Sequence, residues 1–446
     1  MAKDMIATAQ SASELNVYMS IPSGPRPKET TFREWVVTNQ IGIPLTILAM
    51  LLALHNLYPS LRPYTQPFFE LSYYNAAGDY YVQGWNDTYF VLSAALALTA
   101  IRAIAIEWVL QPLARFAGLK RKGSVRLAEQ GWQAMYYGFV WAVGLYLWKN
   151  SVYWGDFSAI WTTWPARPLS GLMKWYLLVE LAFLVQQVFV IHVEERRKDH
   201  YQMLSHHIIT STLLSSAYIY GFYNISNVVL CLMDVVDFLL PSAKILKYLK
   251  FENACNIAFG VFMTTWFITR HIIYNILWLS IYKNIPSKVP FGCYSGVTAE
   301  MISTDGYPDS FAYLFAPFRD LNNPICMNRT ILFIFMGFLL ALQGLSIVWF
   351  SMIVRVAYGV IVTGKSQDSR SDDEEDVEVN EPVEPPVRLV NMDVGATPVV
   401  ADGSPGLDRR RSNGSASLRA RGRGRVPFDQ TDRRALLGRI GCDKPT

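Results

Sequence analysis

The chain has 446 residues and a formal net charge of +4; 51% of its residues are hydrophobic and only 17% are charged. Soluble domains usually carry about a quarter charged residues, so this composition excludes an ordinary soluble multidomain protein. The apolar residues come in blocks of roughly 20, which is the length a helix needs to cross a bilayer core. The predicted fold class is therefore an all-α polytopic membrane protein, because only helices satisfy their own backbone hydrogen bonds in lipid.

The chain divides into four predicted parts. Residues 1–39 are a polar cytosolic segment that lacks the pattern of a secretory signal peptide. Residues 40–110 hold the first two transmembrane helices, 111–361 hold the remaining six, and 362–446 form a tail. The eight predicted spans are 40–58, 89–110, 131–149, 171–191, 206–223, 227–241, 254–281 and 330–354.

Basic residues predict the orientation of these spans. They cluster before span one and after spans two, four and six, which fall on one side of the membrane if every helix crosses in turn. Short loops rich in Lys and Arg face the cytosol, so both termini are expected to be cytosolic. The basic residues that follow the even-numbered spans are Arg115, Lys120, Arg121, Lys122, Arg126, Arg196, Arg197, Lys198, Lys244, Lys247 and Lys250.

The tail 362–446 has an acidic run at Asp372–Asp376 and an Arg-rich end. Such a segment buries too little apolar surface to offset its ordering entropy, and we expect it to be disordered. Ser369 and Ser371 each precede an acidic residue by three positions, as an acid-directed kinase requires. A solvated tail without a regulatory role is the alternative. The Arg cluster fits anionic lipid headgroups rather than nucleic acid.

The five cysteines show no metal-ligand spacing. Cys293 and Cys326 both lie in the long loop 282–329, which the predicted topology places in the lumen, where disulfides persist. We predict that these two cysteines pair; two free thiols are the alternative. Cys231 and Cys255 fall within spans and are expected to pack as small apolar residues.

Ionisable residues inside the spans are functional candidates, because each is costly at membrane depth. His206 and His207 open span five, and span six follows as an antiparallel neighbour, so that Asp237 and His206 are expected to meet in a cavity open to the cytosol. Three other roles for this His–Asp pair remain possible: a buried polar contact between helices, a proton relay in a transporter, and a metal site. Adjacent histidines point about 100° apart on a helix, so one metal cannot easily take both, and no metal is predicted. The other members of this set are Asp234, one helical turn before Asp237, and Arg270 and His271 in span seven.

The stretch 199–248 narrows these choices. It contains Asp199, the pair His206-His207 and Thr210, then Asp234, Asp237, Ala243-Lys244 and Tyr248 after a gap of about 28 residues. This pattern resembles the signature of the longevity-assurance family, the ceramide synthases of the TLC-domain superfamily, in its fungal form. One departure is Asn224, which stands where many members have an arginine.

The resemblance implies a six- to seven-helix catalytic bundle, here within 111–361, in the endoplasmic reticulum membrane. It implies N-acylation of a sphingoid base by acyl-CoA, with His206, His207, Asp234 and Asp237 as the catalytic residues. We expect His206 to attack the thioester and form an acyl-imidazole, Asp237 to orient His206, and His207 to act as base. Asp234 is the less certain carboxylate, and direct transfer with His206 as a base is the alternative.

Substrate sites follow from the same resemblance. Arg196, Arg197 and Lys244 are expected to dock the phosphates of CoA, although the positive-inside bias explains them equally well. Met263 and Trp266 are expected to line an acyl tunnel, and Arg270 and His271 to anchor structure or the hydroxyls of the base. No cofactor is expected, since acyl-CoA is a substrate. The implied protein partners are a second synthase subunit, in a homo- or heterodimer, and a small single-span regulatory subunit.

Two other functions compete with the enzyme. One is a TLC-domain lipid transporter or sensor without acyltransfer, which would not need both the histidine pair and the paired aspartates. The other is a proton-coupled transporter, which would favour inverted repeats with broken helices near the midplane. The sequence shows no internal repeat, so the acyltransferase is the preferred hypothesis.

Overall fold

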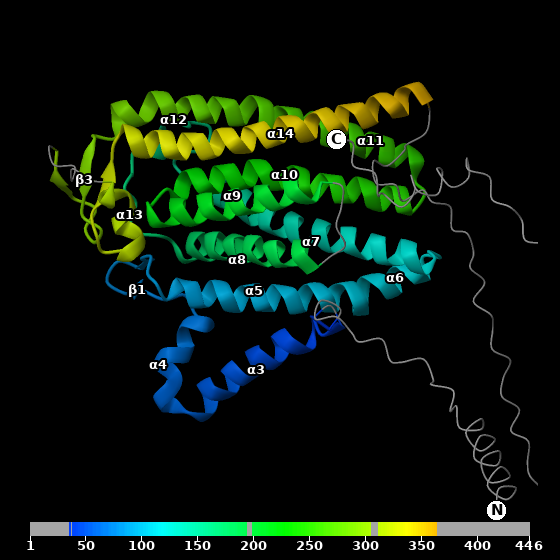
Figure 1. The fold of residues 1–446 in the computed structure, drawn as a ribbon, viewed down its shortest axis with the longest axis horizontal. Helices are drawn as coiled ribbons and strands as arrows, with labels where there is room; N and C mark the ends of the chain where they lie inside the picture. Colours follow the sequence, from blue (N-terminus) through cyan, green and yellow to red (C-terminus); the bar gives the residue numbers. More distant parts are fainter. Residues whose placement is uncertain (1–34, 37, 194–198, 305–310, 364–446) are drawn as a thin grey trace, which may run out of the picture. The chain divides into compact units, whose positions relative to one another are not determined.

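The computed structural model describes residues 35–36, 38–193, 199–304 and 311–363, which all lie in the first of two compact units, Met1–Asp376. The predicted tail, with Ser369 and Ser371, and most of the segment 1–39 lie outside the described residues. Helices dominate the described chain and run side by side as a bundle (Figure 1), which confirms the all-α class.

Each of the eight predicted spans coincides with a helix. Two of these helices continue through a π-helical segment, α5 through η3 and α11 through η5. The bundle is formed by the helical elements α3 (Gly42–Leu57), α5 (Asp87–Ile104), η3 (Ala105–Leu110), α6 (Gln111–Phe116), α7 (Arg121–Lys149), α8 (Gly171–Val193), α9 (His200–Ile219), α10 (Tyr223–Tyr248), α11 (Glu252–Trp266), η5 (Phe267–Ile273), α12 (Tyr274–Lys288) and α14 (Arg329–Thr363). Short helical turns are η1 (Pro59–Leu61), α4 (Arg62–Thr65), η2 (Gln66–Phe68) and η4 (Ala159–Trp161).

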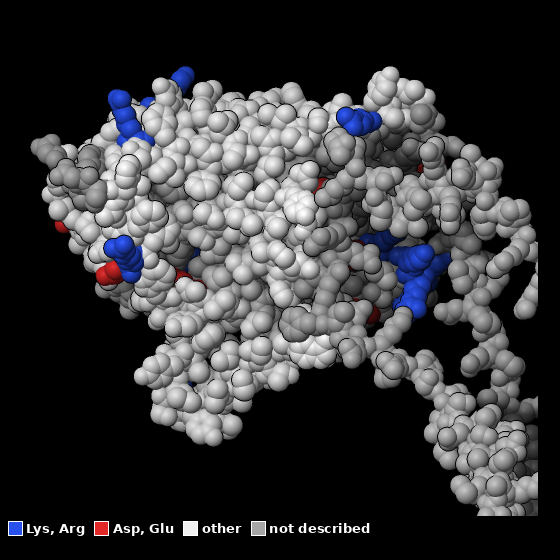
Figure 2. Space-filling model, in the orientation of Figure 1, with Lys and Arg blue, Asp and Glu red and all other residues white. Residues whose placement is uncertain are grey.

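Four helical stretches of the described chain are long and apolar enough to cross a membrane: Asp87–Phe116, Gly171–His192, Glu252–Lys288 and Arg329–Gly359. The pair Gly42–Leu57 and Pro59–Phe68, bent by 112°, would make a fifth. The helices α7, α9 and α10 are of similar length but carry more polar residues, and they run within the same bundle (Figure 1). On the face drawn in Figure 2, Lys and Arg gather at the two ends and leave the band between them almost uncharged. The chain is therefore a multi-pass membrane protein.

The helix α10 lies inside the bundle, against α7, α9 and α11. Among the other helices, α8 packs on α5 and α9, and α14 packs on α9 and α12. Gly221 makes the tight turn from α9 to α10 possible, because its φ of +73° is a left-handed conformation and a Cβ there would lie 2.8 Å from the carbonyl oxygen of Ala166.

Two helix boundaries differ from the prediction. The sixth span was expected to end at Pro241, yet α10 continues to Tyr248 with Pro241 buried inside it. Membrane helices tolerate an internal proline when neighbouring helices pack around it, and α7 and α11 flank α10. The fifth span was expected to begin at position 206, whereas α9 begins at His200, which places His206 nearly two turns into the helix.

The loop 282–329 carries a small sheet and a helix rather than an irregular chain. Strands β4 (Met301–Ser303), β3 (Gly292–Tyr294) and β5 (Ile325–Met327) pair antiparallel in that order, and α13 (Ala312–Arg319) packs beside β5. Cys293 lies opposite Cys326 in the β3–β5 register, and the two form a disulfide, as predicted. A second hairpin, β1 (Tyr74–Asn75) with β2 (Tyr80–Tyr81), precedes α5.

Candidate active site

A cavity of about 1140 Å³, including its open mouth, runs through the bundle between α9, α10, α12 and α14. Ionisable and polar side chains gather at one end of it, and the remaining walls are mostly apolar. The polar residues at that end are Tyr137, Glu180, His206, His207, Thr210, Asp234, Asp237 and Ser346, whereas Ser226 lines the other end beside Ile225. The apolar walls include Leu213, Leu214, Ala217, Phe222, Ile225, Val229, Leu230, Met233, Ile281, Ile285, Met327, Leu332, Phe335, Leu339 and Leu342.

The four residues predicted to be catalytic share this cavity. His206 and His207 face it from α9, and Asp234 and Asp237 face it from α10. The two imidazole rings have their centroids 5.3 Å apart, and the ring of Trp349 on α14 meets His206 edge-on at 5.2 Å. The histidine pair and the aspartate pair were therefore correctly expected to come together.

Asp237 pairs with Arg270 and not with His206, which corrects the predicted catalytic pair. The guanidinium of Arg270 donates to Asp237 Oδ2 at 3.2 Å and to the carbonyl oxygen of Met233 at 3.0 Å. It also stacks on the ring of Trp266, with 4.0 Å between the guanidinium carbon and the ring centroid. The π-helical segment η5 presents Arg270 to α10, and an arginine at membrane depth takes the nearest carboxylate.

Both histidines keep a ring nitrogen available for a ligand. Nδ1 of His206 and Nδ1 of His207 have no hydrogen-bond partner within the described ranges. Their helix is instead held through its backbone, because the hydroxyl of Thr210 donates to the carbonyl oxygens of both residues, at 2.9 and 3.2 Å. Buried polar atoms normally have partners, so unpaired ring nitrogens facing a cavity indicate a site for a reacting group.

Glu180 of α8 belongs to the same site, and the sequence analysis missed it. Its side chain is 2% exposed, lines the cavity, and lies close enough to Asp234 for the two carboxyl groups to interact electrostatically. The sequence does single out Glu180, because it is a charged residue inside the apolar run Leu177–Phe183. The rule that singled out Asp234 and Asp237 applies equally to this residue.

Several predicted substrate-binding residues lie outside the cavity. Met263 and Trp266, which were expected to line an acyl tunnel, do not line this cavity. They pack with Val236 of α10 and Phe262 in an apolar cluster that Trp349 of α14 also contacts, and this cluster does not line the cavity. His271 is also outside, where its Nδ1 lies 3.0 Å from Nε2 of Gln343.

The residues expected to bind CoA are only partly described. Lys244 lies on α10 two turns beyond Asp237 and is not among the lining residues. Arg196 and Arg197 lie outside the described residues. Asn224, at the other end of α10, donates to the hydroxyl of Thr163 at 3.2 Å and is 13 positions from Asp237. The departure from the family arginine is therefore remote from the histidines.

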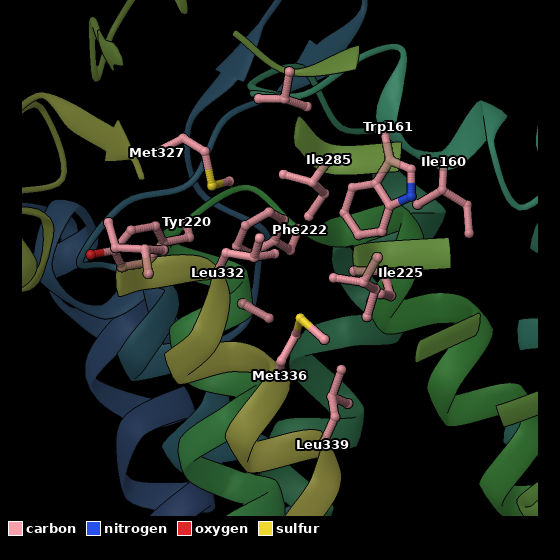
Figure 3. Packing of buried hydrophobic residues seen from close by; sticks show 14 of the residues in the cluster. Ile160, Trp161, Tyr220, Phe222, Ile225, Ile285, Met327, Leu332, Met336 and Leu339 are labelled. Atoms are coloured by element: carbon pink, nitrogen blue, oxygen red, sulfur yellow. The ribbon is translucent and has the colours of Figure 1, made fainter. Parts of the chain in front are cut away.

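The apolar end of the cavity is closed by side chains from separate segments. Figure 3 shows Trp161 beside Ile285, Phe222 and Ile225 below them, and Met327 on the opposite side. Met327 belongs to β5 and follows the disulfide-bonded Cys326 directly, so the small sheet contributes to the wall. A long apolar ligand could lie along this cavity with its polar head beside the histidines.

The described residues contain no group of three or more His, Cys, Asp and Glu side chains arranged to hold a metal ion. The chemistry that these residues can perform is nucleophilic attack by an imidazole, proton transfer by a second imidazole, and binding of positive charge by carboxylates.

Comparison with known proteins gives a consistent family. The TLC domain family matches residues 126–355. A sphingosine N-acyltransferase-like protein of Alternaria alternata is 39% identical, with 79% of each chain covered. A ceramide synthase of Gibberella moniliformis is 35% identical, over 76% of this chain and 80% of the relative, and a sphingosine N-acyltransferase of Schizosaccharomyces pombe is 36% identical, over 75% and 79%.

Proposed function

The chain belongs to the TLC-domain family, and from this membership we propose that it is a ceramide synthase, which transfers a fatty acyl group from acyl-CoA to the amine of a sphingoid base. The observation that carries the proposal is the cavity itself. A histidine pair stands at its polar end, and most of the remaining wall is apolar. This arrangement suits a thioester at one end and a hydrocarbon chain along the other.

In the proposed reaction, a ring nitrogen of His206 attacks the thioester carbonyl. The carbon–sulfur bond breaks, CoA leaves as its thiolate, and an acyl-imidazole remains on His206. The amine of the sphingoid base then attacks the acyl carbon, the bond to the imidazole breaks, and His207 takes a proton from the amine. The unpaired Nδ1 atoms of both histidines support these roles. Asp237 is paired with Arg270, so its proposed role is to hold Arg270 beside the site rather than to form a hydrogen bond with His206.

The direct alternative has His206 acting only as a base, without an acyl-enzyme. The reaction needs no cofactor in either form, because acyl-CoA enters as a substrate. CoA is proposed to dock at the polar end, where Lys244 and, outside the described residues, Arg196 and Arg197 follow the helices of the site. We place this end at the cytosolic face of the endoplasmic reticulum membrane, with a second synthase subunit and a single-span subunit as candidate partners.

The test uses purified full-length protein with a panel of fatty acyl-CoA species and a sphingoid base, and detects N-acyl product by mass spectrometry. We expect product from the wild type and from His200→Ala, a histidine of α9 that does not line the cavity, and none from His206→Ala. Incubation with acyl-CoA alone should add one acyl group at His206. An active His206→Ala variant would refute the proposed nucleophile. Product formation without the adduct would favour direct transfer. Absence of product from folded wild type, with every substrate pair, would refute the enzyme.

A further inference from the structure

The carboxyl groups at the polar end outnumber the cations there. Glu180, Asp234 and Asp237 all line the cavity, and none of the lining residues is Lys or Arg. Arg270 does not line the cavity itself. Of the three carboxyl groups, it forms an ion pair with that of Asp237. The polar end therefore offers two more carboxyl groups than its one guanidinium can neutralise.

The residues that carry the two remaining carboxyl groups are buried and line the cavity. Glu180 is 2% exposed and Asp234 is 5% exposed, and one oxygen of each, Oε1 and Oδ2, has no hydrogen-bond partner in the described part of the chain. An unpaired carboxylate in apolar surroundings is costly, so each must hold a proton or meet a cation. A cationic ligand would take the place of that proton.

His207 is a second and independent sign of a ligand at this position. It is 7% exposed, lines the same cavity, and has an unpaired Nδ1. A neutral imidazole in the same cavity can accept a proton from a bound ammonium and leave the amine free to react.

We propose that Glu180 and Asp234 form the ammonium subsite of the enzyme, which holds the protonated amine of the sphingoid base between α8 and α10; this assignment rests on the proposed acyltransfer. The ammonium gives one proton to His207, and its nitrogen lone pair attacks the acyl carbon on His206. The new carbon–nitrogen bond forms as the bond to the imidazole breaks, and the released imidazole nitrogen takes the second amine proton.

The variants Glu180→Gln and Asp234→Asn test the subsite, since each keeps shape and removes charge. Loss of a charge-assisted contact to the amine should raise the KM for the sphingoid base by about 10-fold or more. The KM for acyl-CoA should stay within about 2-fold, because CoA does not meet these groups. Glu180→Asp should recover part of the loss. Glu107→Gln is the matched control, since Glu107 is an exposed carboxylate on η3 that does not line the cavity.

A pair of ligands separates charge recognition from a merely structural role. A long-chain trimethylammonium compound should inhibit the wild type in competition with the base, and a long-chain alcohol of equal length should not. Glu180→Gln should lose this discrimination.

The inference is overturned if both variants keep the wild-type KM for the base, or if the cation and the alcohol inhibit the wild type equally. If the wild type makes no ceramide, the proposed function fails. Thermal stabilisation of the wild type by the cation, compared with the alcohol, would then decide the subsite alone.

Discussion

At the scale of single residues, Arg270 determines how charge is arranged in the site. Its guanidinium is 3% exposed and binds Asp237, the Met233 carbonyl and the face of Trp266 at once. A planar guanidinium can donate in several directions and stack, whereas an ammonium is a point charge on a flexible stem. Arg270 thereby fastens η5 to α10 and leaves His206 without a carboxylate partner.

We predict that Arg270→Lys lowers stability although it conserves the charge. Lysine cannot hold the carboxylate, the carbonyl and the ring together, and the expected loss is about 1–3 kcal/mol. Thermal unfolding in detergent measures the effect. The control is Arg319→Lys at the exposed end of α13, which should leave the unfolding temperature unchanged. Equal unfolding temperatures for Arg270→Lys and wild type would show that the multiple contacts contribute little.

At the scale of elements, a buried ionic network joins α5, α8 and α9 away from the histidines. Lys174 of α8 is fully buried and forms an ion pair with Asp87 at 2.7 Å. Its ammonium also donates to the carbonyl oxygens of Ser72 and Val82, at 2.9 and 2.7 Å. Tyr218 of α9 donates its hydroxyl to Asp87 Oδ2 at 2.8 Å. These contacts link α5, α8, α9 and the segment before α5.

We predict that Lys174→Met destabilises the fold by about 3–5 kcal/mol, because it leaves the buried carboxylate of Asp87 without its cation. The double variant Lys174→Met with Asp87→Leu should be more stable than the single one, since both charges are then gone. Lys149→Met, at the exposed end of α7, is the control. Additive losses in the double variant, measured by thermal unfolding, would contradict a coupled pair.

At the scale of the whole molecule, the cavity joins two ends of the bundle that have different chemistry. Along α14 the lining runs from Ser346 to Leu332, which is ~21 Å at 1.5 Å per residue. An extended acyl chain of about 16 carbons, at ~1.25 Å per methylene, would fill that length. The disulfide-bonded sheet closes the far end through Met327.

We predict that Met327→Trp shifts the products toward shorter acyl chains. The larger ring would occupy this end of the cavity and leave less length for the acyl chain. Overpacking a well-packed protein interior typically costs ~1–3 kcal/mol. Competition among acyl-CoA species of graded length measures the shift. Met301→Trp is the matched control, because Met301 is 39% exposed on β4 and does not line the cavity. An unchanged product profile for Met327→Trp would mean that the chain does not reach this end.

Much of this architecture followed from local pattern. Apolar runs predicted eight spans, each of which coincides with a helix of the described residues, because a helix in lipid must be apolar over a fixed length. The histidine pair and the aspartate pair were expected in one cavity, since a short turn makes α9 and α10 neighbours. The pairing of Cys293 with Cys326 followed from the loop they share. Glu180 could also have been predicted, because it is an ionisable residue inside an apolar run.

Other features required the tertiary structure. The sequence determined which ionisable side chains have a high free-energy cost in a membrane, but not which partner stabilises each of them. Asp237 meets Arg270 rather than His206 because η5 departs from the regular helical period and turns the guanidinium toward α10. Met263 and Trp266 have the apolar character of a cavity wall, yet they pack against Val236 and Phe262 and do not line the cavity. Side-chain partners and cavity walls depend on helix rotation and packing angle, which are set by contacts between segments far apart in the chain.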